Sequence, residues 1–267
     1  MRPHVGYQRG LSLVELMVAI VIGLLLTAIV SQLFLGSKQT YRTQDSSARL
    51  QENARYALGL LTREIRMARY HVSDPNTQFA TLLPVEGQND TGFGASDEIT
   101  VRYFGRDNSA GAAADGTVFD CLGTAAKRTT DLVVDRFYIA QDAANNNEPT
   151  LYCDNGAGGQ PLVAGIESMH ILFGEDTDAD GTPNRFRPAQ IVNMNNVLSV
   201  RLSLLLRTNT QSVATELDTK TYNHFGNAYA PGAVAPADDA GSVYDPADDR
   251  ANRRLFSTVI GLRNKLD

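Results

Sequence analysis

The apolar residues of this chain follow three different patterns, and the first is a continuous run near the amino terminus. No charged side chain occurs within residues 16–37. A helix of about 20 residues is long enough to cross the hydrocarbon core of a bilayer. The run therefore predicts the transmembrane half of a helix over residues 11–35. One carboxylate, Glu15, lies just inside its start, where an acid is costly unless a partner neutralises it.

The second pattern has helical spacing and predicts that the same helix continues as an amphipathic, periplasmic half over residues 36–70. Residues 41–70 contain no proline and only one glycine, Gly59, so they favour a helix. Apolar residues recur at intervals of three or four: Leu50, Ala54, Ala57, Leu58, Leu61, Ile65 and Ala68. We expect this stripe to pack on a globular head. The arginines should lie mostly on other faces: Arg49, Arg55, Arg63, Arg66 and Arg69.

The third pattern alternates with a period of two and predicts strands in the remainder of the chain. The predicted strands are residues 98–103, 131–140, 150–153, 166–173, 198–204 and 255–262. Asp74-Pro75-Asn76 is expected to end the helix before them. A long helix followed by strands predicts an α+β fold, with a β-rich head over residues 71–267 and an antiparallel sheet on the helix. Residues 223–249 are rich in Ala, Pro, Gly and Asp and are expected to form a long surface loop.

Length and charge narrow the function classes. A chain of 267 residues has room for one anchored helix and one sizeable head. Its formal charge of −6 argues against general nucleic-acid binding, which needs a basic face, and is compatible with cations. The head contains both cysteines, Cys121 and Cys153. They can form a disulfide if the head lies outside the cytoplasm, and the alternative is two buried thiols.

The spacing around Glu15 suggests how its charge is neutralised. If the peptide bond after Gly10 were cut, Leu11 would become the amino terminus and Glu15 the fifth residue. An ammonium and a carboxylate would then share one end of the apolar helix, within one molecule or between neighbours. A secretory signal peptide would instead need a cleavage site after the apolar run. Residues 28–31 are a poor one, and a plain signal anchor is the other alternative.

Residues Arg9, Gly10, Leu11 and Glu15 resemble the class III leader of type IV pilins and pseudopilins. The resemblance implies that residues 1–10 are a leader, which a prepilin peptidase removes before it methylates the amine of Leu11. It also implies a pilin-like fold and a single-pass protein of the bacterial inner membrane with a periplasmic head, later drawn into a pilus. Lysines and arginines on the two sides of the span do not fix its orientation.

The head is similar to the PilW family of minor pilins. The similarity rests on the cysteine pair, on the acidic turn 176–181 and on the carboxy-terminal residues 256–259 and 262–264. It implies a low-abundance subunit that works with other minor pilins, the major pilin and the pilus assembly machinery to prime and cap the pilus. The family is similar to the J-type minor pseudopilin of type II secretion, which is the alternative function. A third hypothesis is a binding module that contacts calcium, a tip adhesin, a surface or DNA.

The acidic turn is a candidate cation site. Asp176, Asp178, Asp180 and Gly181 match the first half of a calcium loop, and Asn184 occupies its ninth position. The twelfth position, where a bidentate Glu is expected, is Arg187. The turn is therefore either a weak Ca²⁺ site or a polar connection between strands.

Catalytic motifs give little support for an enzyme. The sequence has no nucleophile elbow, zinc-binding His-Glu-x-x-His or phosphate-binding loop. None of the four histidines, at positions 4, 71, 170 and 224, has a metal-ligand partner at a useful spacing. We therefore expect no catalytic site and no cofactor other than Ca²⁺.

Overall fold

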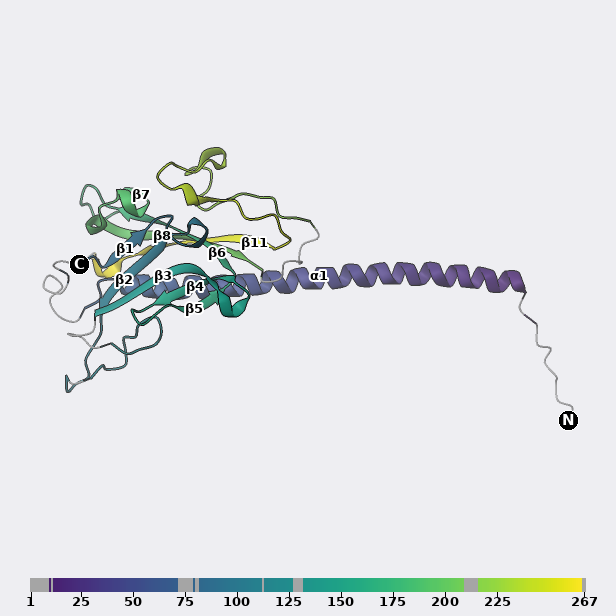
Figure 1. The fold of residues 1–267 in the computed structure, drawn as a ribbon, viewed down its shortest axis with the longest axis horizontal. Helices are drawn as coiled ribbons and strands as arrows, with labels where there is room; N and C mark the ends of the chain where they lie inside the picture. The colour runs from purple at the N-terminus through teal and green to yellow at the C-terminus, as the bar shows by residue number, and fades with distance from the viewer. Residues whose placement is uncertain are drawn as a thin grey trace. The chain divides into compact units, whose positions relative to one another are not determined.

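The computed structural model describes residues 10, 12–71, 79, 82–111, 113–126, 132–208 and 216–265. It divides into two units, Met1–Asp45 and Ser46–Asp267. One helix, α1 (Leu13–Met67), supplies residues to both (Figure 1). The predicted leader residues 1–9, Leu11 and the predicted stop signal at residues 74–76 lie outside the described part of the chain.

Helix α1 ends at Met67, three residues before its predicted end. Arg69 adopts a positive φ of 63°, the left-handed conformation that ends many helices. Its amide donates to the carbonyl of Arg102, 2.9 Å away in the head. From the carboxy-terminal segment, Asn264 Nδ2 donates to the carbonyls of Arg66 and Ala68, both at 3.1 Å. The helix therefore ends where groups of the head form hydrogen bonds with its backbone.

Within the described residues, the head contains two large antiparallel sheets and one small sheet of two strands. The first has the order β1-β2-β3-β4-β5, so each strand pairs with the next along the chain. The second has the order β11-β8-β6-β7. Strands β9 and β10 pair only with each other and form the small sheet. The strands are β1 (Val85–Gln88), β2 (Glu98–Phe104), β3 (Leu132–Asp142), β4 (Glu148–Asp154), β5 (Gln160–Ala164), β6 (Ile166–Glu175), β7 (Arg185–Arg187), β8 (Val197–Arg207), β9 (Tyr222–Asn223), β10 (Val243–Tyr244) and β11 (Arg253–Gly261).

Short 3₁₀ helices connect the strands. They are η1 (Phe93–Ala95), η2 (Ala143–Asn145), η3 (Ala189–Ile191), η4 (Met194–Asn196), η5 (Pro231–Ala233), η6 (Ala240–Ser242) and η7 (Arg263–Lys265). All six predicted strands are present. The strands that were not predicted are β1, β5, β7, β9 and β10, which have five residues or fewer.

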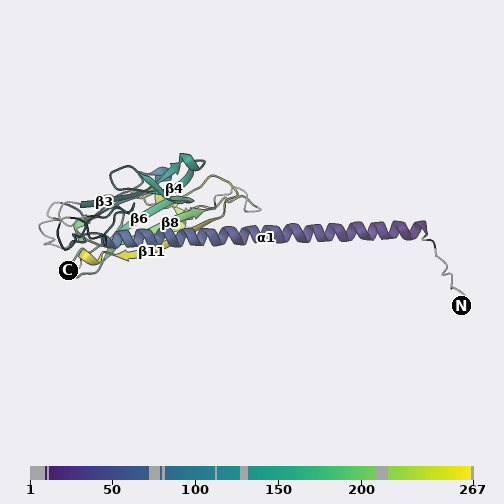
Figure 2. The same cartoon turned by 90° about the horizontal axis from the view of Figure 1, so that it is seen from below.

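The core of the head lies between the sheets and the carboxy-terminal part of α1 (Figure 2). Leu50, Ala54, Ala57, Leu61, Ile65 and Ala68 are buried, and Leu58 packs partly buried against the same core. This confirms the predicted stripe. The five arginines point elsewhere, since four are exposed and Arg69 is half-buried. The α+β fold, with one long apolar helix and antiparallel sheets, is confirmed.

The segment 223–249 corrects one expectation, because it is more than a surface loop. His224, Phe225, Ala230, Asp239 and Ser242 are all buried. His224 Nδ1 lies 3.0 Å from Ser203 Oγ of β8, and the ring of His224 lies 4.5 Å from that of His170 in β6. The segment therefore covers part of the second sheet. Its small residues allow this close approach, since a Cβ at Gly241 would collide with Ala95 and His170.

Candidate functional site

The start of α1 has a local partner for Glu15. Ser12 Oγ accepts a hydrogen bond from the Glu15 amide at 3.2 Å, and Glu15 Oε2 accepts one from the Ser12 amide at 3.4 Å. These reciprocal bonds form a capping box, which satisfies amides that a helix start leaves unpaired. The Ser-x-x-Glu spacing would have revealed it from the sequence. Pairing of Glu15 with the Leu11 amine stays a prediction, because Leu11 is not among the described residues.

The apolar residues that follow are not covered by any other part of the chain that the structure describes. Every residue from 13 to 38 is exposed, including Leu13, Leu25 and Phe34 at 74%, 60% and 67%. Among the described residues, α1 is the one helix that is long and apolar enough to cross a membrane. Gly10, at the predicted cleavage site, is also exposed. This surface fits a membrane anchor.

A buried polar cluster joins the other half of α1 to the head. Glu64 is 1% exposed, and its Oε2 lies 3.0 Å from the hydroxyl of Tyr103 in β2. The same hydroxyl lies 2.7 Å from Asp135 Oδ2 in β3 and 2.9 Å from the carbonyl of Phe119. One hydroxyl proton cannot serve three acceptors, so a proton on a carboxyl group would relieve the cluster.

The surroundings of Asp135 keep that proton bound. Burial raises the pKa of Asp135 from its ordinary 3.8 to about 7. The hydrogen bond from Tyr103 opposes this rise, and the negative charge of Glu64 adds to it. Burial likewise raises the pKa of Tyr103, with Glu64 and Asp135 contributing. The sequence did not reveal this cluster, because its members come from α1, β2 and β3.

Cys121 and Cys153 form a disulfide, as one of the two sequence interpretations predicted. It joins the segment between β2 and β3 to β4 and closes a loop of sequence separation 32. The Cys121 amide donates to Asp135 Oδ2 at 3.0 Å, so the disulfide and the polar cluster support the same part of the first sheet. On the chain-entropy model a loop of this size contributes roughly 3–4 kcal/mol.

The acidic turn lies between β6 and β7, and its side chains mostly bond within the turn. Asp176 Oδ1 accepts from the Ala179 amide at 2.7 Å, and Asp176 Oδ2 accepts from the Gly181 amide at 2.9 Å. Asn184 Nδ2 donates to Asp178 Oδ1 at 3.1 Å. Asp176, Asp178 and Asp180 each still place a carboxylate oxygen within 4.8 Å of the others. Calcium binding here stays a prediction.

The structure brings together two histidines that nothing in the sequence pattern paired. His170 and His224 are buried with their ring centroids 4.5 Å apart. Asp90, Asp97 and Asp239 gather around His170. These residues come from three separate segments of the chain, namely the connection between β1 and β2, strand β6 and the segment 223–249, so spacing along the sequence carried no signal of the cluster. His71 lies partly buried after α1, and His4 is outside the described residues.

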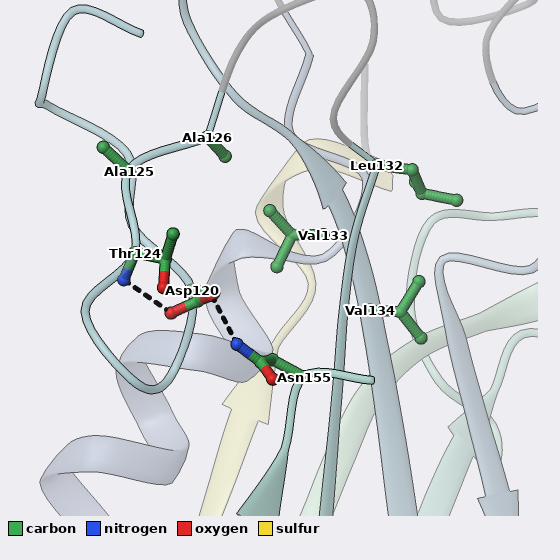
Figure 3. Close-up of a pocket in the computed structure, with 8 residues that line it drawn as sticks. All are labelled: Asp120, Thr124, Ala125, Ala126, Leu132, Val133, Val134 and Asn155. Atoms are coloured by element: carbon green, nitrogen blue, oxygen red, sulfur yellow. Dashed lines mark hydrogen bonds between the residues drawn. The ribbon is translucent and has the colours of Figure 1, made fainter. Parts of the chain in front are cut away.

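A small pocket opens beside the disulfide-bonded segment (Figure 3). Asp120 lines it, but its carboxylate is already engaged, because Oδ1 accepts from the Thr124 amide at 2.8 Å and Oδ2 from Asn155 Nδ2 at 2.8 Å. Thr124 and Asn155 also line the pocket, and the remaining lining residues are apolar: Ala125, Ala126, Leu132, Val133 and Val134. The pocket offers no free charged group to a ligand.

Two family models match the chain at different places. Residues 136–264 match the family described as type IV pilus-assembly protein W. Residues 6–31, which include Gly10 and Glu15, match the prokaryotic N-terminal methylation motif. None of the curated proteins matches the chain. Among solved structures, a type IV-like pilin from Thermus thermophilus is 14% identical, with a TM-score of 0.45, over 81% of this chain and 97% of that one.

Proposed function

We propose that this chain, a type IV pilin-like protein with a PilW-like head, is a minor pilin that primes pilus assembly and lies at the pilus tip. The observation that carries the proposal is the exposed apolar half of α1 next to a leader that matches the methylation motif. Such a surface needs either lipid or the helices of other subunits around it. A pilin is surrounded by lipid before assembly and by the helices of other subunits afterwards.

Assembly in this proposal uses the leader and Glu15 together. Prepilin peptidase cuts after Gly10 and methylates the amine of Leu11, while residues 11–35 hold the protein in the inner membrane. Other minor pilins and the major pilin then replace lipid around the helix. Glu15 pairs with the amino terminus of a neighbouring subunit, and this pairing fixes how far one helix is staggered against the next. An ion pair in such apolar surroundings is specific because an unpaired charge there is costly.

Replacement of Glu15 by Val tests this mechanism. Cleavage and membrane insertion should be retained, because the apolar run becomes longer, whereas incorporation into pili should fall at least several-fold. Glu52→Val is the matched control, since Glu52 is an exposed acid on the same helix, 3.6 Å from Arg55. The measurements are the mass of the mature protein, surface pilus number and the amount of this subunit in sheared pili. Normal pili and normal incorporation in Glu15→Val would contradict the mechanism.

The phenotype of a deletion separates the two machines that such a subunit could serve. Loss of surface pili and of twitching, with exoproteins still released, is the result expected for a minor pilin. Loss of exoprotein release with normal pili would assign the chain to type II secretion as a J-type pseudopilin instead. A tip adhesin as partner should co-purify with the full chain from sheared pili, and it should be lost from pili of the deletion strain.

A further inference from the structure

The cluster around His170 joins the two sheets and the long segment 223–249. Asp90 follows β1, Asp97 precedes β2, His170 lies in the middle of β6 and Asp239 lies in the long segment just before η6. Each places one possible ligand atom within 4.8 Å of the others. Asp97, His170 and Asp239 are 2%, 0% and 1% exposed. Three of the four side chains are therefore closed off from solvent.

The atoms that face one another here have contacts that are too long for hydrogen bonds. His170 Nδ1 lies 3.6 Å from Asp97 Oδ1 and 3.8 Å from Asp239 Oδ1. Both ring nitrogens of His170 and Asp239 Oδ1 are buried without a hydrogen-bond partner among the described residues. Buried polar atoms are nearly always paired. An unpaired imidazole that points at two carboxylates is therefore an observation separate from the acidic cluster itself.

Hydrogen bonds from the protein hold both carboxylate oxygens of Asp97 and one of Asp239 in place. Asp97 Oδ2 accepts from the Ile171 amide at 2.7 Å, and Asp97 Oδ1 accepts from the Asp90 amide at 2.9 Å. Asp239 Oδ2 accepts from the Tyr229 hydroxyl at 2.7 Å. Outer partners of this kind orient metal ligands and are typical of metal sites.

The negative charge of the aspartates favours a bound cation. Among the described residues, none of the three aspartates forms an ion pair with a lysine or arginine. Two of them, Asp97 and Asp239, are buried, and a buried carboxylate without a positive partner is costly. A bound cation would supply that partner.

We propose that Asp97, His170 and Asp239, with Asp90, bind a divalent first-row transition ion, and that Zn²⁺ fits best. Zinc accepts one nitrogen and several carboxylate oxygens, with bonds of about 2.0–2.2 Å, so its tetrahedral ligands lie about 3.4 Å apart. The two contacts of His170 Nδ1 are close to that separation. Calcium prefers oxygen ligands alone. The ion would tie the segment 223–249 to both sheets, a role that does not depend on the function proposed above.

Zinc titration of the full-length, tag-free protein in detergent micelles tests the proposal. Protein stripped with a chelator should take up about one Zn²⁺ per chain and unfold several degrees higher when zinc is in excess. Asp239→Asn and His170→Gln should lower the affinity at least tenfold. Asp178→Asn, in the exposed acidic turn, is the matched control and should keep the wild-type affinity.

Three results would overturn the proposal. They are no uptake of zinc, an equal loss of affinity in Asp178→Asn, and stabilisation by Ca²⁺ but not Zn²⁺ that depends on Asp239. If the His170 variant does not fold, X-ray absorption of the zinc-loaded wild-type protein decides. Imidazole among the zinc ligands supports the site, and a shell of oxygen alone contradicts it.

Discussion

The two halves of α1 have the same backbone but different surroundings. Residues 13–38 are exposed all round, whereas residues 50–68 bury one stripe in the core of the head. The first half is apolar on every face. The second half confines its apolar residues to one face and places arginines on the others. The second half therefore has its packing partner within the chain, whereas the first half has none among the described residues and is long and apolar enough to cross a membrane.

The largest expected effect comes from making the same substitution, Leu to Ala, in each half of α1. Leu61→Ala should destabilise the head by about 2–5 kcal/mol, because Leu61 is 0% exposed and its loss leaves a cavity. Leu25→Ala, at a residue 60% exposed, should leave the unfolding of the head unchanged. Thermal unfolding in micelles, followed by circular dichroism, gives both values. Equal losses from the two changes would refute the contrast.

Removal of the disulfide tests whether the second half of α1 depends on the head for its stability. Replacement of Cys121 and Cys153 by Ala should cost the head roughly 3–4 kcal/mol. When this variant unfolds, residues 50–67 should lose their protection from hydrogen exchange together with the strands, because their stripe packs on them. Residues 13–35 should stay protected in the micelle. Wild-type protein treated with a reductant is the control and should behave in the same way; retained protection of residues 50–67 would contradict the dependence.

The polar cluster at Asp135 predicts how the link between helix and head responds to pH. Because the folded head raises the pKa of Asp135 to about 7, it binds this proton more tightly than the unfolded chain does. The stabilisation is complete below about pH 4 and is lost as the pH rises towards 7. Between pH 5 and 7 this should lower the free energy of unfolding by about 2 kcal/mol.

Asp135→Asn keeps the size of the side chain and removes its titration, so the slope between pH 5 and 7 should become flatter. The groups that face Asp135 are Glu64 of α1, Tyr103 of β2 and Asp120 of the segment between β2 and β3. Urea unfolding at several pH values measures the slope. An unchanged slope in the variant would show that another group causes it.

The smallest expected effect concerns the start of the first half. Ser12→Ala removes the acceptor of the Glu15 amide and should cost the helix start about 1 kcal/mol. Amides of residues 13–16 should exchange faster in micelles, while the head unfolds as before. Ser31→Ala is the control, because Ser31 Oγ bonds back to the carbonyl of Thr27 inside the helix and caps nothing. Faster exchange in both variants would argue against a specific cap.

The sequence predicted those parts of the fold that repeat a pattern over many residues. Three patterns extend over enough residues to be recognised. They are the uncharged run of residues 16–37, the stripe from Leu50 to Ala68, and the alternation in β2 and β8. Strands such as β7 are too short to show a period. The cluster of His170 with Asp239 was not predictable, because it depends on how the segment 223–249 folds back. Buried acids such as Glu64 were missed because their partners lie far away in sequence.

The capping box at Ser12 gives the assembly mechanism proposed above a defined starting state. The Glu15 carboxylate already accepts a hydrogen bond from an amide one turn away, so it is not left without a donor. If the leader is removed and Glu15 pairs with the amine of a neighbouring subunit, as we propose, this short-range contact is exchanged for an ion pair. Under that proposal, the exchange favours joining a filament over remaining dispersed in the bilayer.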